Sequence, residues 1–366
     1  MRLTIPQPHL LKTLQTVEHA VNDRSTLPIL TNVLLETREG ELILTATDLD
    51  VGIRCRFPLT QPTEQGAVAL PARKLTTIIR ELPEELITLE ARKNHIATLQ
   101  CGASSFRIPG LPAEDFPVLP AVESDHPVTI PQGTLKALIA KTAHAMSMEE
   151  TRFILNGALL NAQKSELTIV ATDGRRLAMA RGQLNEPVKQ SLQAVIPAKA
   201  IRELGRLLQD DTDDVAIALL KENQLNFRFG PVAVLTRLIE GQFPQYEKVI
   251  PAPSKHIATC DRQLFMSAVR RASLMTTAAS QAVVFELTAN RLIVLKESAE
   301  LGSAREELPV TYTGPALTVA FNPEFWLDAL KTIDTDEVAI EMAGPDRPAV
   351  IRQPDFTFLV LPMKVS

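Results

Sequence analysis

The stretch LTATD at residues 44–48 recurs 125 residues later as IVATD at 169–173. Three further landmarks repeat in nearly the same phase: 3–11 with 128–136 and 257–265, 71–75 with 197–201 and 322–326, and 114–117 with 241–244. One such match would be weak. Four landmarks in register indicate that the chain is built from three copies of one unit.

The repeat sets the domain organisation of the 366-residue chain. Its period exceeds the roughly 20–50 residues of solenoid repeats, and each copy is large enough to enclose its own core. Proline-bearing polar stretches separate the copies. We therefore expect three domains, at 1–124, 126–252 and 254–366.

Each copy has the same expected order of elements. A short alternating strand opens it, a helix follows, a strand hairpin comes next, and a second helix begins after Pro71, Pro197 or Asn322. The six expected helices cover 7–24, 72–82, 132–146, 198–208, 261–275 and 322–333. The fold class is therefore α+β, with two helices laid on antiparallel sheets in every domain.

Composition excludes several classes of protein. Hydrophobic residues make up 45% and charged residues 22%, which is an ordinary globular balance without an apolar run of the ~20 residues that span a membrane. The stretch 1–6 lacks the apolar core of a signal peptide, so we expect a cytoplasmic protein with no membrane partner. Three scattered cysteines and six unpaired histidines predict neither disulfides nor a metal site, and no cofactor motif occurs.

Positive charge is unevenly distributed. The net charge of −5 alone argues against nucleic-acid binding, yet the six expected helices carry fourteen basic and seven acidic residues. A basic helical face produces a local positive field even on an acidic protein. Such a face suits contact with phosphates without reading of bases, and the 4% aromatic content argues against a stacking platform for single strands. The pattern favours the backbone of duplex nucleic acid.

Two aspartates, Asp48 and Asp173, end the repeated LTATD and IVATD stretches and could form a carboxylate pair for hydrolysis. An aspartate after a strand more often makes a turn by accepting hydrogen bonds from its own backbone. No nucleophile elbow, P-loop or dinucleotide fingerprint occurs. We therefore expect no catalytic residues, with a hydrolase kept as the alternative.

The chain resembles the bacterial DNA polymerase III beta subunit family, the DNA sliding clamps, over its whole length. The resemblance is carried by TLPIL at 26–30, PARK at 71–74, LNG at 155–157, ATDGRRLA at 171–178, FPQY at 243–246 and LPMK at 361–364. It implies a head-to-tail homodimer, a ring of six domains around duplex DNA with helices on the inner wall. A regulatory homologue that does not serve the main replicase is a second alternative, which stimulation of the polymerase would separate from a clamp.

The resemblance also implies two sets of contact residues. DNA-binding positions would be Arg24, Arg73, Lys74, Arg152, Phe153 and Lys199, within helices and the 147–152 loop region. The dimer interface would join Phe106 and Ile108 of the first domain to Leu274 and Met275 of the third. The nearby segment TTAASQA at 276–282 lacks the charged residues expected at this interface.

The third implied site is a groove between the second and third domains that binds short peptides. Its walls would be Leu155, Thr172, Gly174, Arg175, Arg176, Leu177, Pro244, Val249, Val360, Leu361, Pro362 and Met363. The replicative polymerase subunit, the clamp loader, and other polymerases and repair proteins with a clamp-binding peptide would dock there. An apolar groove would also explain why the stretch 358–363 stays apolar, although a final sheet strand is an equal interpretation. Arg175 stands where the family commonly has histidine.

Overall fold

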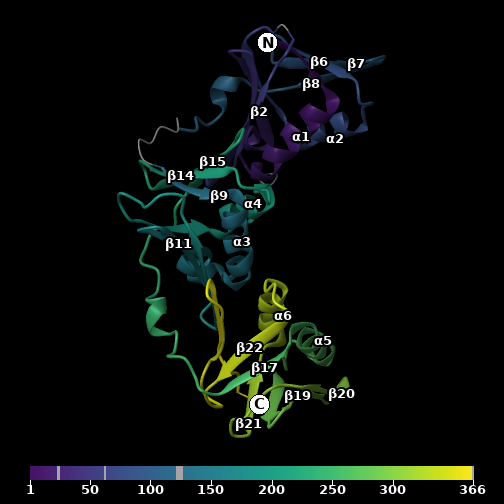
Figure 1. Ribbon diagram of the computed structural model, residues 1–366. Helices are drawn as coiled ribbons and strands as arrows, with labels where there is room; N and C mark the ends of the chain where they lie inside the picture. The colour runs from purple at the N-terminus through teal and green to yellow at the C-terminus, as the bar shows by residue number, and fades with distance from the viewer. Residues whose placement is uncertain (23–24, 62, 121–126, 365–366) are drawn as a thin grey trace. The chain divides into compact units, whose positions relative to one another are not determined.

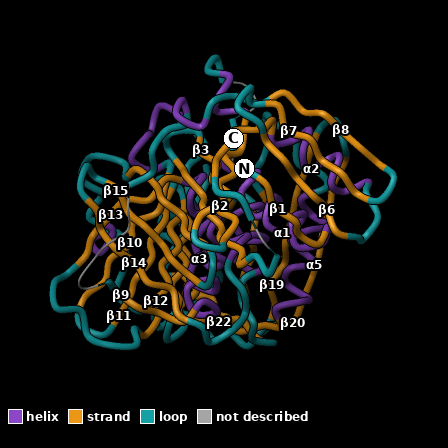
Figure 2. Tube along the Cα trace, turned by 90° about the horizontal axis from the view of Figure 1, so that it is seen from above, coloured by secondary structure: helices purple, strands orange, loops and turns teal. Residues whose placement is uncertain are grey.

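The computed structural model describes residues 1–22, 25–61, 63–120 and 127–364 (Figure 1). Within them the chain forms 24 strands and six α-helices, and strands make up more of the trace than helices do (Figure 2). The helices are α1 Gln7–Val17, α2 Ala72–Glu81, α3 Gln132–Thr142, α4 Ala198–Leu207, α5 Arg262–Ser273 and α6 Pro323–Lys331. Each sequence repeat therefore contributes two helices and eight strands, which confirms the expected α+β fold of three repeated domains.

The chain divides into two compact units, residues 1–133 with 202–238, and residues 134–201 with 239–366. The first unit contains an eight-stranded antiparallel sheet in the order β5-β2-β3-β4-β16-β15-β14-β9. Its strands are β5 Gly66–Pro71, β2 Asn32–Arg38, β3 Glu41–Thr47, β4 Val51–Pro58, β16 Val232–Arg237, β15 Gln224–Phe229, β14 Asp214–Leu220 and β9 Val128–Pro131. Four come from the first repeat and four from the second, and they meet where β4 pairs with β16.

The second unit contains an equivalent eight-stranded sheet in the order β13-β10-β11-β12-β24-β23-β22-β17. Its strands are β13 Leu192–Pro197, β10 Gly157–Gln163, β11 Glu166–Thr172, β12 Arg176–Gln183, β24 Phe356–Val360, β23 Ala349–Arg352, β22 Glu337–Met342 and β17 Ile257–Asp261. The second and third repeats meet where β12 pairs with β24. We call the β4–β16 and β12–β24 pairings the first and second junctions.

Two four-stranded sheets complete the units. In the first unit the order is β1-β6-β7-β8, formed by β1 Arg2–Pro6, β6 Leu86–Ala91, β7 Ile96–Cys101 and β8 Ser104–Pro109. In the second unit the order is β20-β19-β18-β21, formed by β20 Gly302–Pro309, β19 Arg291–Ser298, β18 Val283–Thr288 and β21 Leu317–Phe321. By position in the repeat, β8 corresponds to β16 and β24, and β20 corresponds to β4 and β12. The counterparts of β8 and β20 in the other repeats pair with each other at the junctions. In the described structure β8 and β20 themselves are edge strands.

The helices bury one face each against these sheets. Helix α1 packs on α2, and α5 packs on α6 (Figure 1). Trp326 of α6 is fully buried and lies within 5.6 Å, between ring centroids, of Phe265, Phe285 and Phe321. Edge-to-face aromatic contacts of this kind add to the free energy of burial. Asn322 caps the start of α6 by accepting a hydrogen bond from the Glu324 N–H, as expected for a helix that begins with Asn-Pro.

Two α-helices are shorter than the sequence predicts. The helix expected over 7–24 ends at Val17 and continues as a 3-10 turn, η1 Glu18–Ala20, before extended backbone at Val21. The helix expected over 132–146 ends at Thr142 and continues as η4 Ala143–Ala145. The hydroxyl of Thr142 donates to the carbonyls of Leu138 and Ile139, a competing bond that disturbs a last helical turn. Helical spacing of apolar residues cannot distinguish a 3-10 continuation from an α-helix.

Candidate functional site

A tight turn at residues 172–176 connects β11 to β12. The Asp173 Oδ1 accepts hydrogen bonds from the backbone N–H groups of Arg175 and Arg176, at 2.9 and 3.0 Å. Gly174 has a φ of +86°, a conformation that a residue with a Cβ adopts only at a cost. The turn interpretation of Asp173 is therefore confirmed, and Asp48 accepts the same bonds in the first repeat. Both carboxylates are used structurally, which argues against the hydrolase alternative.

The Arg176 side chain contacts two carboxylates and an aromatic ring. Its Nε donates to Asp173 Oδ2 and its Nη1 donates to Asp328 Oδ2, each at 3.0 Å. Its guanidinium carbon lies 4.3 Å from the centroid of the Phe325 ring, a cation–π contact. The side chain is only 11% exposed, so the charge is neutralised by two carboxylates rather than by solvent.

The strand β24 continues the same surface. Arg176 faces Val360 and Leu177 faces Leu359 in the antiparallel register. Beyond β24 the Leu361 N–H donates to the Arg175 carbonyl at 2.9 Å, and the Met363 N–H donates to the Ala320 carbonyl at 2.8 Å. The apolar stretch is thus the final strand of the sheet, and its continuation stays attached to the second and third repeats.

An apolar cluster lies beneath these residues. Leu177, Leu359, Phe243 and Tyr246 are all buried in it, and the half-buried Leu155 packs against it. Ile154, Ile239 and Ile250 also pack against it. Of the other expected groove residues, Val249 is 55% exposed and Leu361 is 40% exposed, while Pro362 and Met363 are half-buried and Met363 pairs with Ala320. Exposed apolar side chains set around a buried apolar cluster are characteristic of a peptide-binding surface. The structure thus places most of the expected groove residues on adjoining segments.

Arg152 and Phe153 lie in the 3-10 segment η5 Glu150–Leu155. Arg152 donates from Nη1 to the Asp173 carbonyl at 2.9 Å and pairs with Glu149 at 3.2 Å. It is therefore attached to the 172–176 turn, although its side chain remains 45% exposed. Phe153 is 62% exposed.

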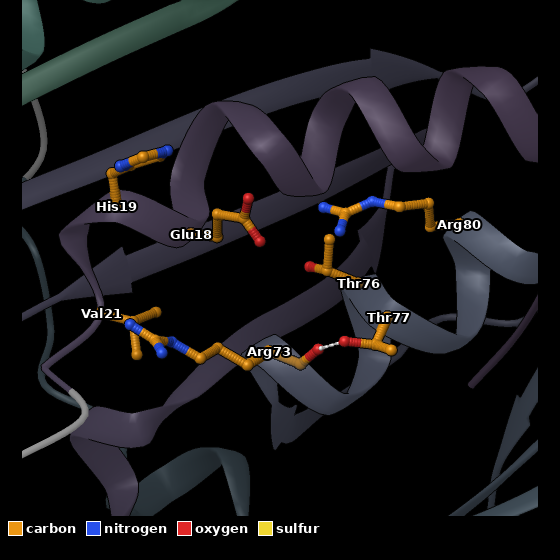
Figure 3. A pocket seen from close by; sticks show the side chains of 7 residues that line it. All are labelled: Glu18, His19, Val21, Arg73, Thr76, Thr77 and Arg80. Atoms are coloured by element: carbon orange, nitrogen blue, oxygen red, sulfur yellow. Dashed lines mark hydrogen bonds between the residues drawn. The ribbon is translucent and has the colours of Figure 1, made fainter.

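The other expected DNA contacts lie on helices. Arg73 and Lys74 are exposed on α2, Lys199 is half-buried on α4, and Arg24 lies outside the described residues. Arg73 and Arg80 line a hollow of about 330 Å³ between η1 and α2. Figure 3 shows the Arg80 guanidinium and the Glu18 carboxylate directed into this hollow, with Arg73 extending toward Val21.

The four expected dimer residues differ in exposure. Phe106 on β8 is 37% exposed and Leu274, after α5, is 69% exposed, whereas Ile108 is only 4% exposed and packs within its own unit. The unusual segment 276–282 is held by the buried Lys296, whose Nζ donates to Ser280 Oγ at 2.7 Å and to the Ala282 carbonyl at 3.0 Å. A buried amine thus stabilises a segment that lacks charged residues of its own.

Sequence reasoning missed Asp328 and Phe325. Asp328 counted only as an acidic residue of an expected helix. One signal was present, since the spacing of three between Phe325, Asp328 and Lys331 places them on one face of that helix. Which residue this face meets in space is a tertiary fact that spacing does not show.

Neither a metal site nor a membrane span occurs in residues 1–22, 25–61, 63–120 and 127–364. No cluster of three or more His, Cys, Asp or Glu side chains there could hold a metal ion. None of the helices in the same ranges is long and apolar enough to cross a membrane.

Comparison with known proteins matches three family models along the chain. They are the N-terminal, central and C-terminal domains of the DNA polymerase III beta subunit, at residues 1–120, 129–245 and 247–364. The beta sliding clamps of Pseudomonas putida and Escherichia coli K12 are 33% and 34% identical over the full length of both chains. A crystal structure of the Pseudomonas aeruginosa sliding clamp bound to griselimycin covers the whole chain with a TM-score of 0.95 and 33% identity.

Proposed function

The chain belongs to the bacterial DNA polymerase III beta subunit family and is a non-catalytic DNA sliding clamp, and from that premise we propose which of its surfaces bind partners, DNA and a second copy. The clamp binds duplex DNA and the replicative polymerase. We propose domains at 1–124, 126–252 and 254–366 and a cytoplasmic location, where DNA replication takes place.

The peptide site is the surface around the second junction. The single observation that carries this assignment is the continuation of β24 along the 172–176 turn: the Leu361 N–H donates to the Arg175 carbonyl, next to Leu177 and Leu359 of the apolar cluster. Met363, two residues on, pairs with Ala320 of the third repeat. Short peptides bind such surfaces through leucine or aromatic anchors. Griselimycin, which is bound to relatives 33% and 32% identical, would occupy the same surface here.

Calorimetric titration of griselimycin into the full chain tests the peptide site. The unaltered chain should bind it, and Met363→Ala should weaken binding about tenfold, since a methionine side chain at the centre of an interface contributes on the order of 1–2 kcal/mol. Deletion of 362–366 should weaken it further while the oligomeric state stays unchanged. Val118→Ala is a matched control, because Val118 is 92% exposed and lies in the other unit. Equal affinity in all three variants would refute the assignment.

Each unit would contact DNA through basic residues of its own. In the first unit these are Arg73 and Lys74, with Arg24, and in the second they are Lys199 and the Arg152–Phe153 segment. Arg and Lys contacts to phosphates are independent of sequence and weaken with salt, which allows a clamp to slide. Retention on DNA then depends on ring closure rather than on affinity. Charge reversal of Arg73 and Lys74 should reduce the salt slope of DNA binding by about one unit for each phosphate that is no longer neutralised.

A head-to-tail dimer would repeat the junctions between chains. The edge strands β8 and β20 hold the positions of the strands that pair at the two junctions, so β20 of one copy can add to β8 of another. Phe106 and the exposed Leu274, with Met275 and Ile108 behind them, would lie at this contact. Negative-stain microscopy tests it: a closed ring with an open centre supports the proposal, and compact monomers at micromolar concentration would contradict it.

A further inference from the structure

The two junctions are internal copies, which makes one a control for the other. At the first junction the Asp48 Oδ1 accepts from the Asp50 and Val51 N–H groups, and the Arg237 N–H donates to the Asp50 carbonyl at 2.9 Å. At the second junction Asp173 and the Leu361 N–H make the corresponding bonds. The backbone frame is therefore the same at both turns.

Each junction has an acidic residue at the same position of the second helix of a repeat. At the first junction it is Glu203 of α4, which pairs with Arg206 at 2.9 Å and lies 4.0 Å from His19 Nδ1. At the second junction, 125 residues on, it is Asp328 of α6, which pairs with Lys331 at 3.3 Å. The position equivalent to His19 is His144.

One difference between the junctions lies at the first residue of the strand that follows the turn. Val51 of the first junction corresponds to Arg176 of the second. The acidic residue of the first junction, Glu203, lies near His19, whereas that of the second, Asp328, accepts a hydrogen bond from Arg176. Both ring nitrogens of His144 are buried without a hydrogen-bond partner among the described residues. Burial, followed by the nearby positive charge of Arg176, lowers the pKa of His144 to about 4.

We propose that Asp328 is a positioning residue for the peptide site, acting through Arg176 to fix the 172–176 turn against the third repeat. This inference rests on the peptide site proposed above. Arg176 bonds the turn through Asp173, bonds α6 through Asp328, and stacks on Phe325 of the same helix. One side chain thus joins the turn of the second repeat to the helix that supports β24. No equivalent connection can form from position 51 of the first junction, where the valine side chain is apolar.

The test compares Asp328→Asn with Glu203→Gln in the full chain, using griselimycin as the probe. Asp328→Asn keeps the shape of the side chain but removes the charge that holds Arg176. We expect griselimycin affinity to fall about tenfold, which corresponds to ~1.4 kcal/mol. Glu203→Gln makes the same chemical change at the first junction, where Val51 stands at the position of Arg176, and should change affinity less than about twofold. Asp328→Glu should restore most of the binding.

A second readout separates positioning from general stability. Arg176→Met should remove the positive charge beside His144 and the arginine partner of Asp328, so the His144 pKa measured by NMR should rise from about 4. If Asp328→Asn fails to fold, Phe325→Leu removes the stacking ring alone and should weaken binding about threefold. Equal griselimycin affinity for the unaltered chain, Asp328→Asn and Phe325→Leu would overturn the inference alone. No griselimycin binding by the unaltered chain would overturn the proposed peptide site, and the inference with it.

Discussion

Phe358→Ala tests how far the second junction depends on one side chain of β24. Phe358 is fully buried, and its ring centroid lies 6.2 Å from that of Trp326 and 5.8 Å from that of His144. Replacing a buried phenylalanine by alanine typically costs ~3–5 kcal/mol, from lost burial and from the cavity left behind. In a cooperative unit of roughly 150–250 residues this corresponds to a fall in Tm of about 6–20 °C.

Urea denaturation followed by tryptophan fluorescence measures the change, since Trp326 is the chain's one tryptophan. The matched control is Phe153→Ala, the same substitution at a side chain that is 62% exposed, which should shift stability by no more than ~0.5 kcal/mol. Opening a cavity beside the imidazole should also raise the His144 pKa above about 4, because water then reaches it. A decrease in stability below ~1.5 kcal/mol with an unchanged His144 pKa would refute the packing argument.

Three further outcomes are expected. Burial raises the pKa of Cys55 to about 11 and that of Cys260 to about 12, so both thiols should react with Ellman's reagent at pH 8 only after unfolding; rapid native reaction would contradict this. Gly174→Ala should cost ~1–2 kcal/mol, because its φ is positive and the new Cβ would lie 3.0 Å from Arg152 Nη1, which urea titration would detect. The folded-state pKa of His144 lies below the ordinary 6.5, so between these values the unfolded chain binds one more proton than the folded chain. The free energy of unfolding should therefore decrease as the pH is lowered from about 6.5 to 4. His144→Gln should remove that slope.

Repeats and local patterns predicted most of the fold. The 125-residue spacing identified three copies, and each copy has two helices and eight strands. A strand hairpin after the first helix was also expected, and Glu39 and Gly40, between β2 and β3, have the positive φ angles of a two-residue hairpin turn. The lengths of α1 and α3 were overestimated because their last turns become 3-10 helices that keep the apolar spacing.

The candidate site was less accessible to sequence reasoning. Arg176 was expected as a groove residue from the resemblance alone, and nothing in the sequence connected it to Asp328, 152 residues away. Long-range pairing of charges depends on how β12 and α6 pack, which local propensity does not encode. Ile108 was expected at the dimer interface from the resemblance, and that interface stays a prediction. Its depth in the first unit, with 4% of its surface exposed, is a tertiary property that the resemblance did not supply.

The pairing of β12 with β24 also has a consequence for how the chain acquires its structure. Arg176 pairs with Val360, which is synthesised 184 residues later, and Val51 likewise pairs with the distant Thr236. Contacts between residues so distant along the chain slow folding, because a long loop must lose conformational entropy before these contacts can form. During synthesis the edge of β12, which contains Leu177 and Met179, has unpaired backbone groups until β24 is made. An open apolar edge invites pairing with the wrong chain, so slow translation between these strands should favour aggregation over folding.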